Sequence, residues 1–197
     1  MKKWIAAMLA LALLSAVALA EVSIDETNFP DAAFREAVAE FDADGDGAFS
    51  DGELAKVKQI ECGGKGIQSV KGLEFFTALE SLGVHDNELT ELDVSNNPLL
   101  TFIDAPGNKL TALDVSNNPA LTDLYVQNNG IASLDVSACP KLAELVEKIE
   151  RVTRVFDFGT MDCFEGDDIG CWMFVDAATV VTAGDTVSEK SVKTIEE

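Results

Sequence analysis

Apolar residues recur through the middle of the chain in a frame of the form L-x-x-L-x-V-x-x-N. Strong copies of this frame, such as LTELDVSNNP, start 21 residues apart at Leu89, Leu110 and Ile131. Weaker copies lie before and between them, so that the step alternates between 10 and 11 residues, with starts at Leu79, Leu100 and Leu121. A fixed period of this size predicts a solenoid, because one coil cannot bury its apolar side alone and must stack on its neighbours.

The order of residues within the frame predicts which of them are buried. The second Leu and the Val are two residues apart, so on an extended strand both point into the core. Each coil of 21 residues is therefore expected to carry two short strand-like segments on opposite sides. Stacked amides can satisfy the backbone donors and acceptors of turns, and the ninth position of the frame is Asn at Asn87, Asn97, Asn108, Asn118 and Asn129.

These motifs resemble the short repeats of bacterial leucine-rich-repeat proteins, in which LDVSNN-like segments alternate with L-x-x-L-x-V-x-x-N segments. Upstream, the segment IQSVKGLEFFTALESLGV from Ile67 is similar to the longer internalin-like repeat, with Gly72 and Leu73 opening its return segment. The resemblance covers residues 57–145. It implies an α/β repeat fold, a right-handed leucine-rich-repeat solenoid, on a secreted or cell-surface bacterial protein with a ligand-binding role.

A calcium-binding pattern precedes the repeats. The segment DADGDGAFSDGE, residues 42–53, matches the EF-hand loop at its diagnostic positions, with Gly47 at the sharp bend. Carboxylates from alternate residues, one backbone carbonyl, a hydroxyl and a closing Glu are the oxygen ligands that Ca²⁺ takes in such loops. The predicted ligands are Asp42, Asp44, Asp46, the carbonyl of Ala48, Ser50 and Glu53. An acidic turn that only caps a helix is the alternative.

The flanks of this loop predict two helices. Phe34, Val38 and Phe41 are spaced by four and three residues and give the entering helix one apolar stripe. Ser50 and Glu53 form a capping box for the exit helix. EF-hands usually act in pairs, and no second loop follows, so we expect the hand to cover the open end of the first coil with a structural calcium ion. In the regulatory alternative, calcium exposes a groove.

The N-terminus predicts an exported protein, and the net charge indicates which kinds of partner it can bind. Lys2 and Lys3 precede an apolar run to Ala20, which is typical of a secretory signal cleaved before Glu21; an uncleaved membrane anchor is the alternative. The chain has 35 acidic and 14 basic residues, and its net charge falls from −21 to −23 once these two lysines are removed. Such a charge disfavours nucleic acid and acidic lipid surfaces as partners and favours basic ones.

The four cysteines fall into two classes. Cys62 occupies the inward Val position of a first coil, and Cys139 replaces the Asn of the last clear frame, so both are predicted to be buried and unreactive. Cys163 and Cys171 flank the turn-rich segment FEGDDIG. In an exported chain these two predict a hairpin closed by a disulfide, with two free thiols as the alternative.

Comparison of the repeats with one another separates two faces of the solenoid. The strong copies always present Asp outward, at Asp93, Asp114 and Asp135, and we name these residues the scaffold face. The weaker copies present varied residues, including aromatic ones, which are typical of a binding surface. This variable face contains His85, Phe102, Asp104, Asp123, Tyr125 and Gln127. Alternatively, the C-terminal segment covers Phe102 and Tyr125.

The sequence thus predicts a non-enzymatic binding protein. It lacks H-E-x-x-H and G-x-S-x-G motifs and has one histidine, His85. The leading hypothesis is a calcium-stabilised module that binds a protein or glycan; the alternative is a calcium-dependent docking module resembling a dockerin, although a dockerin would have two calcium loops. The predicted parts are a signal peptide (1–20), an EF-hand cap (21–58), repeats (59–147), a C-terminal β cap (148–187) and a flexible tail (188–197).

Overall fold

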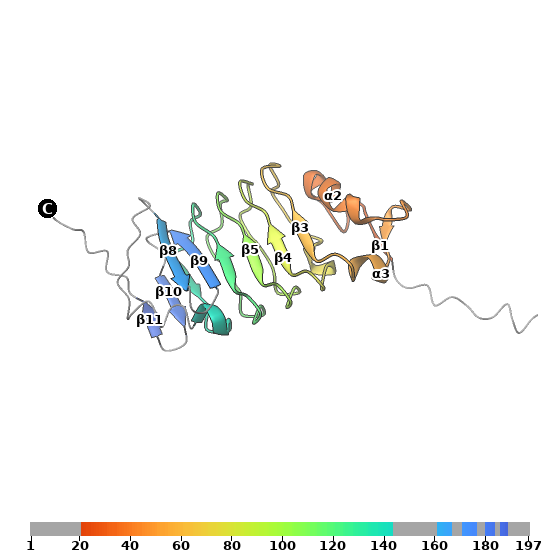
Figure 1. The fold of residues 1–197 in the computed structure, drawn as a ribbon. Helices are drawn as coiled ribbons and strands as arrows, with labels where there is room; N and C mark the ends of the chain where they lie inside the picture. The colour runs from red at the N-terminus through yellow and green to blue at the C-terminus, as the bar shows by residue number, and fades with distance from the viewer. Residues whose placement is uncertain (1–20, 144–160, 167–170, 177–179, 184–185, 189–197) are drawn as a thin grey trace, which may run out of the picture.

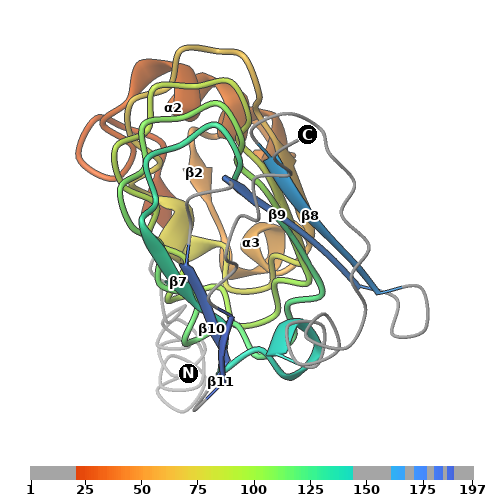
Figure 2. The same cartoon turned by 90° about the vertical axis from the view of Figure 1, so that its left-hand side faces the viewer.

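The computed structural model describes residues 21–143 and four short segments, 161–166, 171–176, 180–183 and 186–188. The predicted signal peptide and nearly all of the predicted flexible tail lie outside these residues. Within them the chain forms a solenoid, with a helical segment at one end and added strands at the other (Figure 1). Viewed along its axis, the coils stack on one another (Figure 2).

One side of the solenoid is a parallel sheet built from the weaker copies of the frame. Its strands are β3 (Gln59–Glu61), β4 (Ser81–Gly83), β5 (Phe102–Asp104) and β6 (Asp123–Tyr125), paired in that order. The central residue of each strand is fully buried, and the four are aligned in register as Ile60, Leu82, Ile103 and Leu124. The predicted inward direction of the second Leu of the frame is confirmed.

The opposite side differs from the prediction of a second strand in every coil. Among the described residues, only the last strong copy forms a strand there, β7 (Ser133–Asp135), which pairs in parallel with β10 (Val180–Ala183). The copies starting at Leu89 and Leu110 have buried apolar positions but no strand. All three strong copies make the same local turn, in which Asp93, Asp114 and Asp135 accept hydrogen bonds from the N–H groups of Ser95, Ser116 and Ser137 at 2.9, 2.8 and 2.9 Å. What distinguishes the last copy is its partner strand, β10.

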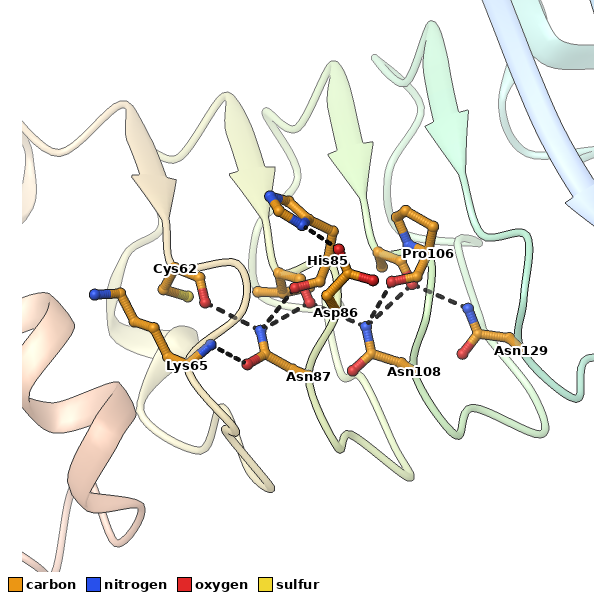
Figure 3. A network of polar contacts seen from close by, with 10 residues as sticks. Cys62, Lys65, His85, Asp86, Asn87, Pro106, Asn108 and Asn129 are labelled. Carbon is orange, nitrogen blue, oxygen red and sulfur yellow. Dashed lines mark hydrogen bonds and ion pairs between the residues drawn. The ribbon is translucent and has the colours of Figure 1, made fainter.

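Asparagines of the weaker copies form a first ladder along one edge of the sheet, Asn87, Asn108 and Asn129 (Figure 3). The Oδ1 atom of Asn108 accepts a hydrogen bond from the Leu89 N–H at 3.0 Å. Its Nδ2 atom donates to the carbonyls of Val84 and Ala105, at 3.0 and 3.2 Å. Both ends of the amide are therefore used, and the amide joins backbone groups of successive coils.

A second ladder on the other side uses only the donor end of the amide. Its members are Asn97, Asn118 and Cys139. The Nδ2 atom of Asn118 donates to the carbonyls of Val94 and Asn97 at 3.0 and 2.9 Å. The Oδ1 atoms of Asn97 and Asn118 are buried and have no hydrogen-bond partner within the part of the chain that the structure describes. The Cys139 Sγ atom makes the equivalent contacts with the Val115 and Asn118 carbonyls. A thiol can replace the amide here because no acceptor is needed.

The N-terminal segment packs on the first coil through phenylalanines. It contains β1 (Val22–Ser23), α2 (Ala32–Val38), the 3-10 turn η1 (Ala39–Phe41), β2 (Ala48–Phe49) and α3 (Asp51–Leu54). The ring of Phe49 lies 5.5 Å from that of Phe76, which follows the 3-10 turn η2 (Leu73–Phe75) of the coil. The predicted stripe of the entering helix is confirmed, with Phe34 and Val38 fully buried and Phe41 packed against the core.

Asp31 and Gly72 fix how this segment meets the coil. Asp31 Oδ1 caps α2 by accepting from the Ala33 and Phe34 N–H groups, and its Oδ2 atom accepts from the coil N–H groups of Gln68 and Ser69. Although burial opposes it, these four bonds lower the pKa of Asp31. Gly72 has φ 104°, and a Cβ atom there would overlap the Phe29 ring.

The C-terminal strands extend both sides of the solenoid. β9 (Cys171–Asp176) pairs in parallel with β6 and antiparallel with β8 (Met161–Gly166), whereas β10 pairs with β7 and β11 (Thr186–Ser188). The hairpin expected around FEGDDIG is thus present, but the disulfide does not fit it. Cys163 pairs with Phe174 and Cys171 with Gly166, a shift of three residues. That shift corresponds to about 10 Å along a strand, beyond the Cα separation of a disulfide.

The two thiols of the repeats are inert in this fold. Cys62 and Cys139 are fully buried free cysteines, and burial raises the pKa of each thiol to about 11. In a Cys163→Ser/Cys171→Ser variant we expect no labelling of these thiols by Ellman's reagent at pH 8, because the thiolate is the nucleophile. Unfolding in guanidinium should release both thiols. Rapid labelling of the native variant would contradict the burial of these residues.

Candidate functional site

The predicted calcium loop brings three carboxylates together. One ligand oxygen from each of Asp42, Asp44 and Asp46 lies within 4.8 Å of the others, and Asp44 and Asp46 are exposed. The backbone holds the loop in shape: Gly45 N–H donates to Asp42 Oδ1 at 2.8 Å, and Gly47 N–H donates to Asp42 Oδ2 at 2.9 Å. Gly45 and Gly47 have φ angles of 75° and 85°, a region that glycine tolerates.

Glu53 closes the loop through hydrogen bonds. Its Oε2 atom accepts from the N–H and the hydroxyl of Ser50, and Oε1 accepts from the Ala43 N–H at 2.8 Å. The bonds from Ser50, followed by that from Ala43, lower the pKa of Glu53 to about 2. The predicted capping box of α3 is confirmed, although this helix ends at Leu54 and is a single turn.

The loop is paired with a strand that sequence reasoning missed. β1 and β2 are antiparallel, with Val22 opposite Phe49 and Ser23 opposite Ala48, and the Ile24 N–H donates to the Gly47 carbonyl at 2.9 Å. A second EF-hand would normally supply such a strand, and here residues just after the expected signal cleavage site supply it. β1 has two residues, too few for a hydrophobic pattern to predict a strand from sequence.

The electrostatics of the loop fit a divalent cation. The Asp46 N–H bonds to Asp44 and favours its charged form, but the negative charges of Asp46, Glu53 and Asp42 outweigh this bond and raise the pKa of Asp44. A bound cation would relieve that repulsion. Oε1 of Glu53 keeps one acceptor site for a metal, and Oε2 becomes a second ligand if the Ser50 hydroxyl turns away.

The variable face carries a two-by-two arrangement of aromatic and acidic residues. Phe102 and Asp104 are on β5, and Asp123 and Tyr125 are on β6, with Phe102 opposite Asp123 and Asp104 opposite Tyr125. All four are half-buried. The two rings contact each other with centroids 5.5 Å apart. Of the C-terminal strands, β9 lies beside β6 in this sheet and β8 lies beyond β9, whereas β10 and β11 extend the side of β7 (Figure 1).

The remaining residues of the predicted face lie just beyond the strands. His85 follows β4; its side chain is 42% exposed, and its Nδ1 atom lies 3.0 Å from Asp86 Oδ2. Gln127 follows β6, but its amide oxygen is buried without a hydrogen-bond partner among the described residues, so that oxygen is not presented for binding. The structure therefore brings five of the six predicted residues to an accessible surface and turns the sixth partly inward.

A groove beside this face was not predicted. It has a volume of about 460 Å³ and lies between α2 and the start of the sheet, lined by Ala33, Glu36, Ala37, Glu40, Glu61 and Lys65. Glu61 joins the groove to the variable face, because its carboxylate lies over Gly83 of β4, where a Cβ atom would overlap it. Glu36 and Glu40 are four residues apart, which places them on one side of the helical segment, but only the packing of this segment shows what they face.

Comparison with known proteins supports the repeat architecture. The Leucine Rich Repeat family matches residues 88–108. The functional domain of InlJ from Listeria monocytogenes, which includes a cysteine ladder, is 27% identical with a TM-score of 0.53, over 61% of this chain and 32% of that one. The fold is that of a leucine-rich-repeat protein. No curated protein matches the chain.

Two further Listeria monocytogenes structures share this leucine-rich-repeat fold. The internalin inlF has 27% identity and a TM-score of 0.55, and the match covers 66% of this chain and 38% of that one. Internalin C2 has 20% identity and a TM-score of 0.53, covering 66% and 57% of the two chains. The matched region thus spans between a third and somewhat over half of these relatives.

Among the described residues, no helix is long and apolar enough to cross a membrane.

Proposed function

We propose that the protein is an exported, calcium-stabilised leucine-rich-repeat module that binds a ligand, a protein or a glycan, through its variable face. The observation that carries this proposal is the contrast between the two sides of the solenoid. On the scaffold face each Asp is engaged with its own backbone, as Asp93 is with Ser95. On the variable face, in contrast, aromatic and acidic side chains alternate on a sheet whose backbone is already paired.

Half-buried aromatic residues suit a binding role. Phe and Tyr contribute large contact areas at a low cost in side-chain entropy, and such residues often dominate the energy of an interface. The resemblance of the repeats to those of secreted and cell-surface bacterial leucine-rich-repeat proteins favours export, and the fold shared with internalins supports a protein ligand. In this proposal calcium is a structural ion, since lone extracellular sites bind at about 10⁻⁴ to 10⁻³ M and stay filled outside cells.

Substitution of both aromatic residues tests the face. In a Phe102→Ala/Tyr125→Ala variant we expect ligand affinity to fall at least ~30-fold, because buried aromatic anchors are worth 2 kcal/mol or more at an interface. The immobilised protein would be incubated with cell extracts and glycan mixtures, and the bound fraction identified and quantified for each variant. Thermal melts would verify that both proteins are folded.

Leu99→Ala supplies the matched control. Leu99 is the large apolar residue that is most exposed among the described residues, at 47%, and it lies in a turn rather than in the sheet. Its truncation removes exposed apolar surface without touching the variable face, so capture should be unchanged. Equal losses in both variants, or none in either, would show that the ligand does not use this face.

A further inference from the structure

The aromatic and acidic residues of the variable face form a pattern that suits one cationic side chain. Asp104 lies opposite Tyr125, and Asp123 lies opposite Phe102, so each ring has a carboxylate beside it on the neighbouring strand. The guanidinium group of arginine is planar, stacks on aromatic rings and pairs with carboxylates through two parallel hydrogen bonds. The ammonium group of lysine can also lie over a ring or pair with a carboxylate, but it has no plane to stack and cannot form the two parallel hydrogen bonds.

The acidic surface continues from these strands to the groove at the N-terminal end. Glu61 lies on β3, two strands from Asp104, and leans over Gly83 into the gap between them. Glu61 also lines the groove, together with Glu36 of α2 and Glu40 of η1. The carboxylates therefore follow a path across the strands, which an extended polypeptide can span.

Few positive charges offset this path. Lys58 and Lys109, at the edges of the same coils, are paired with Glu80 at 3.1 Å and with Glu88 at 3.3 Å. Among the described residues that line the groove, Lys65 is the one with a positive charge. With a net charge of −21 on the whole chain, the long-range field also attracts basic partners.

We propose that the variable face and the adjoining groove bind an arginine-bearing, basic segment of a protein partner. The proposal rests on the proposed function, whose ligand it narrows to a class. Arginine side chains would stack on Phe102 and Tyr125 and pair with Asp104 and Asp123, while further basic residues of the same segment would reach Glu61 and the groove.

The carboxylates of the path contribute to the raised pKa of two groups at its centre, Asp104 and His85. Burial and the charges of Glu61 and Asp86 raise the pKa of Asp104, against the effect of His85. The hydrogen bond to Asp86, with the charges of Asp104, Asp86 and Glu61, raises the pKa of His85 although burial opposes it. The neighbouring carboxylates thus contribute to both shifts, after burial for Asp104 and after the hydrogen bond for His85, and a bound guanidinium group would offset their repulsion.

A peptide titration tests the inference. The probe is a short fluorescein-labelled peptide in which arginine and glycine alternate, with a second peptide that has lysine in place of arginine, and the readout is fluorescence anisotropy with the purified protein. We expect the arginine peptide to bind at least ~3-fold more tightly than the lysine peptide. A Glu61→Gln/Asp104→Asn variant should weaken its binding by ~10-fold, and Lys65→Gln should strengthen it.

The scaffold face gives a control with the same change in charge. An Asp93→Asn/Asp114→Asn variant also removes two negative charges, and Asn can keep accepting the Ser95 and Ser116 N–H bonds. Its effect on peptide binding should not exceed ~2-fold, since only long-range attraction is reduced. An equal effect of the two double variants, or equal affinity for both peptides, would overturn the inference in favour of general charge attraction.

The other outcomes separate this inference from the proposed function. Failure of the peptide to bind, together with capture of a neutral glycan or of a non-basic protein that is lost in Phe102→Ala/Tyr125→Ala, would overturn the basic-segment inference and leave the binding face intact. If neither the peptide nor any captured ligand depends on Phe102 and Tyr125, both fail.

Discussion

Calcium at ~10 mM is expected to raise the melting temperature of the whole chain by roughly 5–10 °C over the value in chelator. With a dissociation constant of about 10⁻⁴ M for an extracellular site, that concentration contributes ~2.7 kcal/mol to the folded state. For a chain of this length, each kcal/mol shifts the melting temperature by about 2–4 °C. The shift should extend to the solenoid, because phenylalanines such as Phe49 and Phe76 join the loop segment to the first coil.

Two substitutions in the loop should separate metal binding from the folding of the metal-free protein. Asp44→Asn removes a carboxylate whose pKa is raised by its acidic neighbours, so it should abolish the calcium increment and leave the melt in chelator equal or slightly higher. Glu53→Gln should abolish the increment as well, but it should also lower the melt in chelator, because Glu53 bonds to Ser50 and Ala43 as a carboxylate. The check is calorimetry with and without calcium.

Asp51→Asn is the matched control for these variants. Asp51 is exposed and lies inside the loop sequence at a position that is not a predicted ligand. Calcium should raise the melting temperature of this variant as much as that of the unmodified protein. If chelator leaves the melting temperature of the unmodified protein unchanged, the structural role of calcium is refuted. If calcium shifts only the early part of the melting transition to higher temperature, the ion stabilises only the loop segment.

Replacement of an asparagine by cysteine should have very different effects in the two ladders. In Asn108→Cys the Leu89 N–H loses its buried acceptor, and one of the donated bonds is lost as well. A buried donor without a partner costs about 1–3 kcal/mol, so with the lost bond we expect a destabilisation of ~3 kcal/mol. In Asn118→Cys the loss should be at most ~1 kcal/mol, because the Oδ1 atom of Asn118 has no partner to lose.

Urea unfolding of the two cysteine variants measures this difference directly. Asn108→Ala and Asn118→Ala serve as controls for the removal of the whole amide, and both should be destabilising, since Asn118 donates to two carbonyls. The chain itself already contains the tolerated replacement at Cys139. Equal destabilisation by the two cysteine substitutions would contradict the assignment of a donor-only role to the second ladder.

The burial pattern of the repeats could be predicted from sequence because it depends on spacing alone. Leu92 and Val94 are buried as the frame requires, and so are Leu134 and Val136. The inward position of Cys62 and the burial of Cys139 followed from the same frame. Strand formation was less predictable. The segments around Leu92 and Leu113 have the frame of β7 but no strand, since a ladder also needs a partner at hydrogen-bonding distance, which β10 supplies for β7 alone.

The functional surfaces show a similar division. The sequence placed aromatic residues on one face, and the structure confirms that Phe102 and Tyr125 share it, but only the alignment of β5 with β6 sets each ring beside a carboxylate. Asp42, Asp44 and Asp46 meet as their spacing predicted. The predicted disulfide between Cys163 and Cys171 does not fit the hairpin, because the register of β8 and β9 separates the two residues along the strands. The sequence did not define that register.

The sequence by itself determined the coil period, the inward residues and the acidic loop, since each of these depends on residues that are close along the chain. Tertiary structure alone decided the pairing of β1 with the loop, the groove between α2 and β3, and the unequal use of the two ends of the amide in the two asparagine ladders. The physical reason is that these features depend on distances between segments about 20 or more residues apart, which chain stacking sets and local pattern does not.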